Sequence, residues 1–427
     1  MDKVRAQCID EHSRLDYAWN GFQEWVADSL VFYPILFMLG AILLVVIAGK
    51  VDDYLVTQEN INEWWQAKSV IGVTISSLVA SSMLTFLAIV FSISLVALQL
   101  ANQQYSPRVI TIFERSYITK IALSLFIGTF VYSFILLVFT LRTRLEQVTI
   151  VSFLIEIILV FASLIIFIVF MKHVMLMIRV THTISLIADE TREAIEETLP
   201  PEKAYIECQI EPFGEADQVI RYAKPRRNLF SKRYDHGVLK GIERSTLLQI
   251  AGKHDCVMRV LPRIGDYVNE GDPVVEVFGE SQLDDNHVNK ALYIGPERAV
   301  YQDPAYGLRM LVDIALQALS PAVNAPTTAH QVITRLTNLL LIISQKPVPT
   351  GVYTDDSSKV RLMQPIYSWE DLITICFTEI QYYGKDDPHT RLSLAAAYDY
   401  LLEKVPDIHK PPLEEQKQVL LGSNIEE

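Results

Sequence analysis

A row of small hydroxyl and amide side chains follows one long apolar stretch, Ser69–Gln103. No charged residue occurs between Lys68 and Arg108. The polar residues are spaced by three, four or seven positions, which places them on one narrow face of a helix. They are Thr74, Ser77, Ser81, Thr85, Ser92, Gln99 and Gln103, with Ala88 in the same row. Such a face either packs closely against another helix or lines a polar path.

Both interpretations of this row stay open at the level of sequence. Close helix packing alone accounts for the small residues, whereas rings of hydroxyls and amides from several subunits would form a polar conduit. Gln99 and Gln103 favour the conduit, because they would line its mouth. Phe86, Leu87 and Phe91 lie near the row and are candidates for an apolar gate.

Glu156 is a carboxylate inside another apolar segment. It lies about nine residues, or about 13 Å at helical rise, from the predicted outer end of its helix. An ionisable residue within a membrane span is costly and marks a candidate functional site. It could pair with a hydroxyl, hold a proton or an ion, or, if it is shallower, extend to the membrane surface.

A third set of polar residues follows the run GPERAVYQDPAYGLRMLVDIALQALSPAVNAPTTA in the C-terminal half. Its members are Arg298, Gln302, Asp303, Asp313 and Asn324. Asp313 has apolar neighbours in sequence, where a carboxylate is costly unless it is paired, and Arg298 or Arg309 could be its partner. The set predicts either a small-molecule pocket or, more simply, a buried ion-pair network that fixes the helices.

No catalytic, metal or cofactor site is predicted. The cysteines (Cys8, Cys208, Cys256 and Cys376) are scattered singly. There is no glycine-rich phosphate loop, no HExxH and no ordered Ser/His/Asp set. The net charge of −13 argues against a nucleic-acid partner, because phosphate binding needs a basic surface.

Four apolar segments position these residues, and each is long enough to cross a hydrocarbon core of about 30 Å. They are Ser29–Gly49, Ser69–Gln103, Ile121–Leu141 and Gln147–Met171. The second would be about 50 Å long as one helix, so it must tilt or project into water before Tyr105-Ser106-Pro107-Arg108 ends it. Residues 1–28 read as an amphipathic helix, either at the membrane interface or packed on a soluble domain.

The distribution of lysine and arginine predicts the orientation of the spans. Val51–Ala67 contains neither residue, whereas both occur before the first span, between the second and third, and after the fourth. Arg142 and Arg144 are exceptions, because they lie between the third and fourth spans, on the side that this pattern predicts to be outside. The expectation is a multi-pass protein of the bacterial inner membrane with both termini in the cytoplasm.

The rest of the chain is predicted to be a cytoplasmic α+β domain. Residues 29–178 form the four-helix transmembrane domain, and 179–200 continue the fourth helix as a stalk ending at Pro200-Pro201. Residues 201–283 are β-rich, and residues 284–427 are mainly helical. Helices are expected near 303–319, 327–344, 369–383, 388–404 and 412–421, the second capped by Thr327 and Thr328.

Within the β-rich part, Gly265-Asp266 and Gly271-Asp272 predict turns between short strands. The pattern G-D-x-V-x-x-G-x-P-V is similar to the half-motif of biotinyl/lipoyl-like barrel-sandwich hybrid domains. That resemblance implies the fold without its cofactor, because no Met-Lys-Met is present. A basic cluster at Arg221–Arg233 is either a solvated loop or a contact for anionic lipid headgroups.

Two longer motifs, VALQLANQQYSPRVI and the C-terminal run quoted above, resemble the bacterial "predicted membrane protein" family of unknown function. The resemblance covers nearly the whole chain and implies the architecture: four α-helical spans followed by a cytoplasmic domain. The family usually has Asn-Asp-Pro where this chain has Asn324-Ala325-Pro326.

The functional hypothesis is a non-enzymatic, homo-oligomeric, channel-like protein. Its second spans would line a polar pathway, and its cytoplasmic domain would gate or filter. The alternative is a non-conducting membrane scaffold or ligand sensor with a cytoplasmic binding domain. The expected partners are the lipid bilayer and other copies of the chain.

Overall fold

The computed structural model describes residues 31–58, 63–104, 116–142, 150–199, 214–224, 234–279, 282–346, 350–355 and 357–422. The predicted helix at 1–28, the turn after Gln104 and most of the Arg221–Arg233 cluster lie outside these ranges. The chain divides into two compact units, one ending at Arg179 and one beginning at Val180. Each unit is described by itself.

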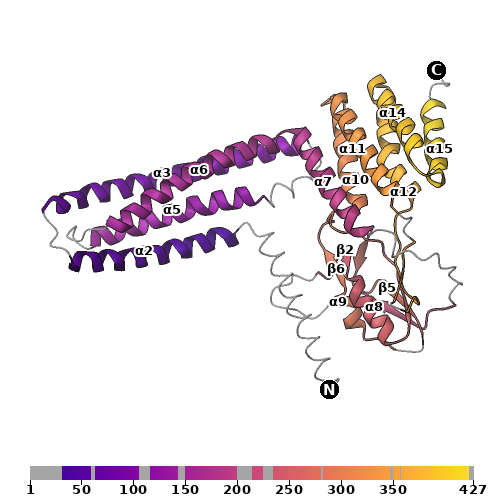
Figure 1. Ribbon diagram of the computed structural model, residues 1–427, viewed down its shortest axis with the longest axis horizontal. Coiled ribbons are helices and arrows are strands. Elements are labelled where there is room, and N and C mark those ends of the chain that lie inside the picture. The colour runs from indigo at the N-terminus through magenta and orange to yellow at the C-terminus, as the bar shows by residue number, and fades with distance from the viewer. Residues whose placement is uncertain are drawn as a thin grey trace. The chain divides into compact units, whose positions relative to one another are not determined.

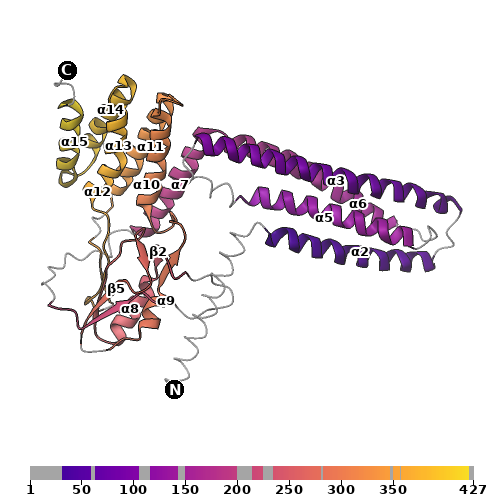
Figure 2. The same ribbon diagram turned by 180° about the vertical axis from the view of Figure 1, so that it is seen from behind.

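The N-terminal unit contains the four predicted spans. Among the described residues, four helices are long and apolar enough to cross a membrane. They are α2 (Phe32–Gln58), α3 (Glu63–Gln104), α5 (Tyr117–Arg142) and α6 (Ile150–Met177). In both views α5 lies between α2 and the other two helices (Figures 1 and 2). Its side chains, Phe126 and Tyr132 among them, contribute to two apolar clusters, one shared with α3 and α6 and one with α2 and α6.

The helix ends differ from the sequence prediction in two places. The acidic segment 51–67 is mostly helical, since α2 continues to Gln58 and α3 already begins at Glu63, with no proline or glycine to break either helix. The 42-residue α3 is about 63 Å long, well beyond a bilayer core. The fourth span and the predicted stalk are two helices rather than one, because the chain leaves the helix at Ile178 and Arg179.

The C-terminal unit is α+β, as predicted. Its strands are β1 (Gln218–Arg221), β2 (His236–Ile242), β3 (Val257–Val260), β4 (Tyr267–Asn269), β5 (Pro273–Phe278), β6 (Leu292–Gly295), β7 (Val352–Thr354) and β8 (Val360–Met363). They form a five-stranded sheet in the order β1-β5-β3-β8-β7 and a three-stranded sheet in the order β4-β2-β6. Only the β3–β8 pairing among these strands is parallel. The barrel-sandwich hybrid stays a prediction.

The predicted turns in the β part are confirmed. Gly265 and Gly271 have φ of +100° and +91°, a region that favours glycine, and they flank β4. Two short helices, α8 (Arg244–Lys253) and α9 (Asp285–Lys290), accompany the sheets. Helix α8 was not expected from the sequence. The core contains Leu239, Leu247 and Val275 among other apolar residues.

The five helices predicted after residue 284 are confirmed. Four of them are α10 (Pro304–Leu319), α11 (Pro326–Ser344), α14 (Pro388–Lys404) and α15 (Lys410–Gly422). The helix expected near 369–383 consists of α12 (Trp369–Ile373), the π-helical turn η2 (Thr374–Thr378) and α13 (Glu379–Tyr383). A 3₁₀ turn, η3 (Asp407–His409), precedes α15. The predicted caps on α11 are wrong, because Ala325 is the N-cap and Pro326 already occupies the first turn.

The segment predicted as a stalk is helix α7 (Val180–Thr198), shown in magenta beside α10 and α11 (Figure 1). One face of α7 is buried within the C-terminal unit. The buried residues are Thr183, Ile184, Ile187, Ala188, Thr191, Ala194 and Ile195. This helix therefore contributes to the core of the C-terminal unit.

An ion-pair network ties β3 to the β7–β8 hairpin, and it predicts acid sensitivity. The Arg361 side chain, only 8% exposed, donates to Asp255 Oδ1 and Asp355 Oδ2, each at 2.7 Å. Hydrogen bonding from Arg361 lowers the pKa of Asp255, and hydrogen bonding from Ser357 and then Arg361 lowers the pKa of Asp355. A carboxyl whose pKa is lowered by folding stabilises the folded state at pH values above its unfolded-state pKa. This stabilisation is lost as the pH falls through the folded-state pKa.

We expect the unfolding temperature of the purified full-length protein to fall below about pH 4, because these carboxyls protonate there in the unfolded chain but only at lower pH in the folded protein. The Asp355→Asn variant should lose part of this acid dependence, and thermal unfolding between pH 7 and pH 3 measures it. An unchanged acid profile in the variant would contradict the assignment.

Candidate functional site

The polar row on α3 lies on the face directed away from the rest of its own unit. Its described side chains are all exposed, namely Thr74, Ser77, Ser81, Thr85, Ser92 and Gln99. The opposite face is buried in the bundle and consists of Ser76, Ala80, Met83, Val90 and Ala97. Gln103 belongs to α3, but its side chain is outside the described residues. Packing within one subunit therefore does not account for the polar row.

Two features of this outward face modify the sequence interpretation. Ser81 Oγ donates to Leu78 O at 3.0 Å and Thr85 Oγ1 donates to Ser81 O at 3.1 Å, so these hydroxyls are satisfied on their own helix. Leu95, 61% exposed, lies on the same face between Ser92 and Gln99. The polar row is therefore interrupted by an apolar side chain.

The three gate candidates do not lie together. The Phe86 ring stacks on Phe126 and meets Phe167 edge-on, with centroids 6.4 and 5.3 Å apart. Leu87 packs against the same cluster. Both residues therefore belong to the interior of the bundle, and only Phe91 is exposed. They are near the polar row in sequence only, because at 100° per residue Phe86 and Leu87 lie about 140° and 120° around α3 from Ser81.

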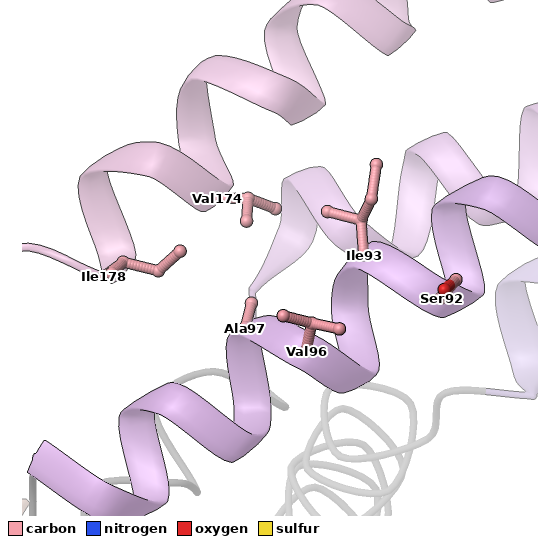
Figure 3. Close-up of a pocket in the computed structure, with 6 residues that line it drawn as sticks. All are labelled: Ser92, Ile93, Val96, Ala97, Val174 and Ile178. Atoms are coloured by element: carbon pink, nitrogen blue, oxygen red, sulfur yellow. The ribbon is translucent and has the colours of Figure 1, made fainter.

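A shallow apolar groove of about 180 Å³ lies between α3 and α6. Its lining consists of Ser92, Ile93, Val96 and Ala97 from α3, with Val174 and Ile178 from the α6 side (Figure 3). Ser92 also belongs to the polar row, so the groove borders the outward face of α3. Apart from the Ser92 hydroxyl, its lining is aliphatic, so the lining contains no acid, base or metal-binding side chain.

Glu156 is buried inside the bundle, with 1% of its surface exposed. The alternative that it extends to the surface is therefore wrong. Ser76 Oγ of α3 donates to Glu156 Oε2 at 2.7 Å. Ser133 of α5 approaches the same carboxylate. Among the described residues, neither Glu156 Oε1 nor Ser133 Oγ has a hydrogen-bond partner.

Asp52, in the Val51–Ala67 segment that contains no lysine or arginine, is a buried carboxylate. It accepts hydrogen bonds from Val151 N at 2.8 Å and from Ser152 N and Oγ at 3.1 and 2.6 Å. These amides open α6, so Asp52 of α2 caps another helix and lies at its positive end. Tyr132 donates to Ser152 O at 2.9 Å in the same region. The sequence signal that could have placed Asp52 in a helix is its position just after an apolar run, with no proline or glycine between them and the rest of α2.

The buried polar residues at this end of the unit come from all four helices. Asp52 is on α2, Ser76 on α3, Tyr132 and Ser133 on α5, and Ser152 and Glu156 on α6. Further along α6, Ser163 hydrogen-bonds Thr129 of α5 at 3.0 Å. Buried polar groups in a membrane span normally face the bundle interior and find partners there, and most of this set does so.

The C-terminal polar residues separate into groups along α10. At its start, Arg298 donates to Asp303 from Nε at 2.9 Å and from Nη2 at 2.6 Å, and Asp303 accepts from Tyr306 N as the N-cap. The Arg298 guanidinium lies over the Tyr306 ring, 5.0 Å from its centroid. Gln302 accepts a hydrogen bond from Ile242 N of β2 at 2.9 Å.

Asp313 and Asn324 are not part of that group. Asp313 pairs with Arg309 at 3.0 Å, and Arg309 also binds Glu379 of α13 at 2.9 Å. Asn324 lies in the turn after α10, with φ of +47°. These contacts link elements of the fold, and the five residues do not surround one pocket. The geometry favours the ion-pair interpretation over a small-molecule site.

Comparison with known proteins agrees with the membrane architecture. A family model described as "Predicted membrane protein (DUF2254)" matches residues 27–400. The chain is 27% identical over 324 residues to "Uncharacterized protein Rv1290c" of Mycobacterium tuberculosis and to "Uncharacterized protein Mb1321c" of Mycobacterium bovis. Each match covers 73% of this chain and 60% of the relative, so the chain spans less than two thirds of those proteins. No solved structure matches the chain.

Proposed function

Because the chain belongs to the family described as "Predicted membrane protein", we propose that it forms a non-enzymatic homo-oligomer whose α3 helices surround a polar pathway. The membrane would be the bacterial inner membrane, with both chain termini in the cytoplasm. The C-terminal unit would gate or filter the pathway. The placement of polar residues on α3 supports the pathway, and the charges at the ends of the spans support the orientation.

The single observation that supports a pathway is the outward direction of the polar row. Lipid tails offer no hydrogen bonds, so a face with hydroxyls and amides is better placed against another subunit or against water. Within one chain, the described helices cover only the opposite face of α3. An axis formed by several copies of α3 would place Thr74, Ser81 and Gln99 toward that axis.

Leu95 would form the narrowest apolar ring of such a pathway. It is one of two exposed apolar residues between Ser92 and Gln99, the other being Val96, and it continues the seven-residue spacing of Thr74, Ser81 and Ala88. Apolar constrictions gate channels by excluding water. Leu95 therefore replaces Phe86 and Leu87 as the gate candidate on that face, with Phe91 beside it.

We expect purified full-length protein in planar bilayers to conduct ions and the Leu95→Ser variant to conduct more, because a hydroxyl wets the constriction. The Ile89→Ser variant is the matched control, since Ile89 is exposed on α3 but lies about 120° around the helix from Leu95. Single-channel recording measures both. Equal currents in the two variants would contradict the role of Leu95.

Cysteine labelling tests the pathway itself. In a background with Cys8, Cys208, Cys256 and Cys376 replaced by serine, a charged thiol reagent should block Ser81→Cys but not Ile158→Cys on the exposed side of α6. The absence of current under every ionic condition would overturn the channel proposal. It would instead favour a non-conducting scaffold or sensor, for which the self-satisfied hydroxyls of Ser81 and Thr85 also argue.

A further inference from the structure

Glu156 and the hydroxyls around it form a buried oxygen cluster that the proposed pathway does not use. Glu156 lies on the interior side of the unit, whereas the polar row of α3 lies on the outside. Ser76 reaches the carboxylate from α3, and Ser133 reaches it from α5. Three helices therefore bring oxygen atoms to one buried point.

The charge of this carboxylate is not balanced by a protein group. Among the described residues, no ion pair reaches Glu156, and the Ser76 hydroxyl that donates to it is neutral. Asp52 of α2 is also a carboxylate, but the amides of Val151 and Ser152 at the start of α6 stabilise its charge. The phenol of Tyr132 is the other titratable group that faces this region. A buried anion without a counter-charge is costly, most of all in a membrane span.

Among the described residues, two oxygen atoms of the cluster, Glu156 Oε1 and Ser133 Oγ, make no hydrogen bond of regular geometry, although Ser133 approaches the carboxylate. Both residues are almost fully buried, at 1% and 0% exposure. A buried polar atom without a partner needs a specific explanation, and a bound ion is one. One ion at this point would satisfy both atoms and balance the carboxylate.

We propose that Glu156, Ser133 and Ser76 bind a small monovalent cation, with Na⁺ as the probe. Carboxylate and hydroxyl oxygens are ligands of hard cations. One carboxylate matches one positive charge. Among the described residues, no group of three or more His, Cys, Asp or Glu side chains comes together, which argues against a divalent or transition-metal site.

The test is the binding of radioactive Na⁺ to the purified full-length protein in detergent, at constant ionic strength with N-methylglucamine as the replacing cation. We expect saturable binding and a rise in unfolding temperature with Na⁺. The Ser133→Ala variant should bind about tenfold more weakly, since it loses one ligand to a charged group. The Glu156→Gln variant should lose both the binding and the Na⁺-dependent stabilisation.

The control is Ser163→Ala, which removes a buried hydroxyl of the same helix that pairs with Thr129 and not with Glu156. It should lower stability without changing the affinity for Na⁺. No saturable binding by the unmodified protein, or undiminished binding by Glu156→Gln, would overturn the proposal. Stabilisation that depends on pH but not on Na⁺ would also overturn it and would assign the cluster to a proton. The pathway proposal does not depend on this result, because its residues lie on the opposite face of α3.

Discussion

Replacing Asp303 with alanine is expected to destabilise the C-terminal unit by about 3–5 kcal/mol. Asp303 is 3% exposed; its Oδ2 accepts from Nε and Nη2 of Arg298, and its Oδ1 accepts from the backbone amide of Tyr306 in α10. Alanine removes the helix cap and leaves a half-buried guanidinium without its counter-charge. Thermal and denaturant unfolding of the full-length protein in detergent measure the change.

Two variants separate the contributions at Asp303. Asp303→Asn keeps an oxygen that can cap α10 but removes the charge, so its stability should lie between the wild type and the alanine variant. Glu196→Ala is the surface control, because it breaks an exposed pair with Arg192 at 3.0 Å and should cost less than about 1 kcal/mol. Equal stability of Asp303→Ala and Glu196→Ala would show that the Arg298–Asp303 contact does not stabilise the unit.

The Gly307→Ala substitution is expected to destabilise the same unit by about 1–3 kcal/mol, although alanine favours helices over glycine. A Cβ at this position would lie 2.1 Å from Thr191 Oγ1 and 2.9 Å from Thr191 Cβ. Thr191 is buried in α7, and its hydroxyl donates to Ile187 O at 2.6 Å. The added methyl group therefore forces α7 and α10 apart, and the unfolding temperature reports it.

Gly252→Ala is the matched control for this clash. Gly252 lies in α8, and a Cβ there would meet no atom within 4 Å, so the substitution should stabilise by about 0.5–1 kcal/mol. Combining Gly307→Ala with Thr191→Ala should cost less than the sum of the two single changes, because the smaller side chain makes room. Strict additivity of the pair would contradict direct contact between these positions.

The helices of this protein were largely predictable because their signals are local. An apolar run without charge or proline predicted α3 as one continuous element beyond the length of a bilayer, and it is. The helices expected near 303–319 and 388–404 are α10 and α14, and each has a proline in its first turn. Helix α8 was missed because a ten-residue helix among strands carries too short a periodic pattern.

Contacts between distant segments could not be predicted in this way. Asp52 binds the amides of Val151 and Ser152, about a hundred positions further along the chain. Gly307 is needed because Thr191 of another helix approaches it. Asp303 and Asn324 belong to one sequence motif, yet they lie at opposite ends of α10 and take part in different contacts.

The sequence by itself determined the membrane architecture, the α+β class of the C-terminal unit and the set of residues that share a face of α3. Only the tertiary structure decided which face of α3 is covered, so that Phe86 packs inside while Ser81 and Leu95 stay outside. It also decided that Glu156 is enclosed by hydroxyls from two other helices. The physical reason is that helical periodicity sets the angles between side chains of one helix, whereas the packing of helices far apart in the chain sets what each side chain meets.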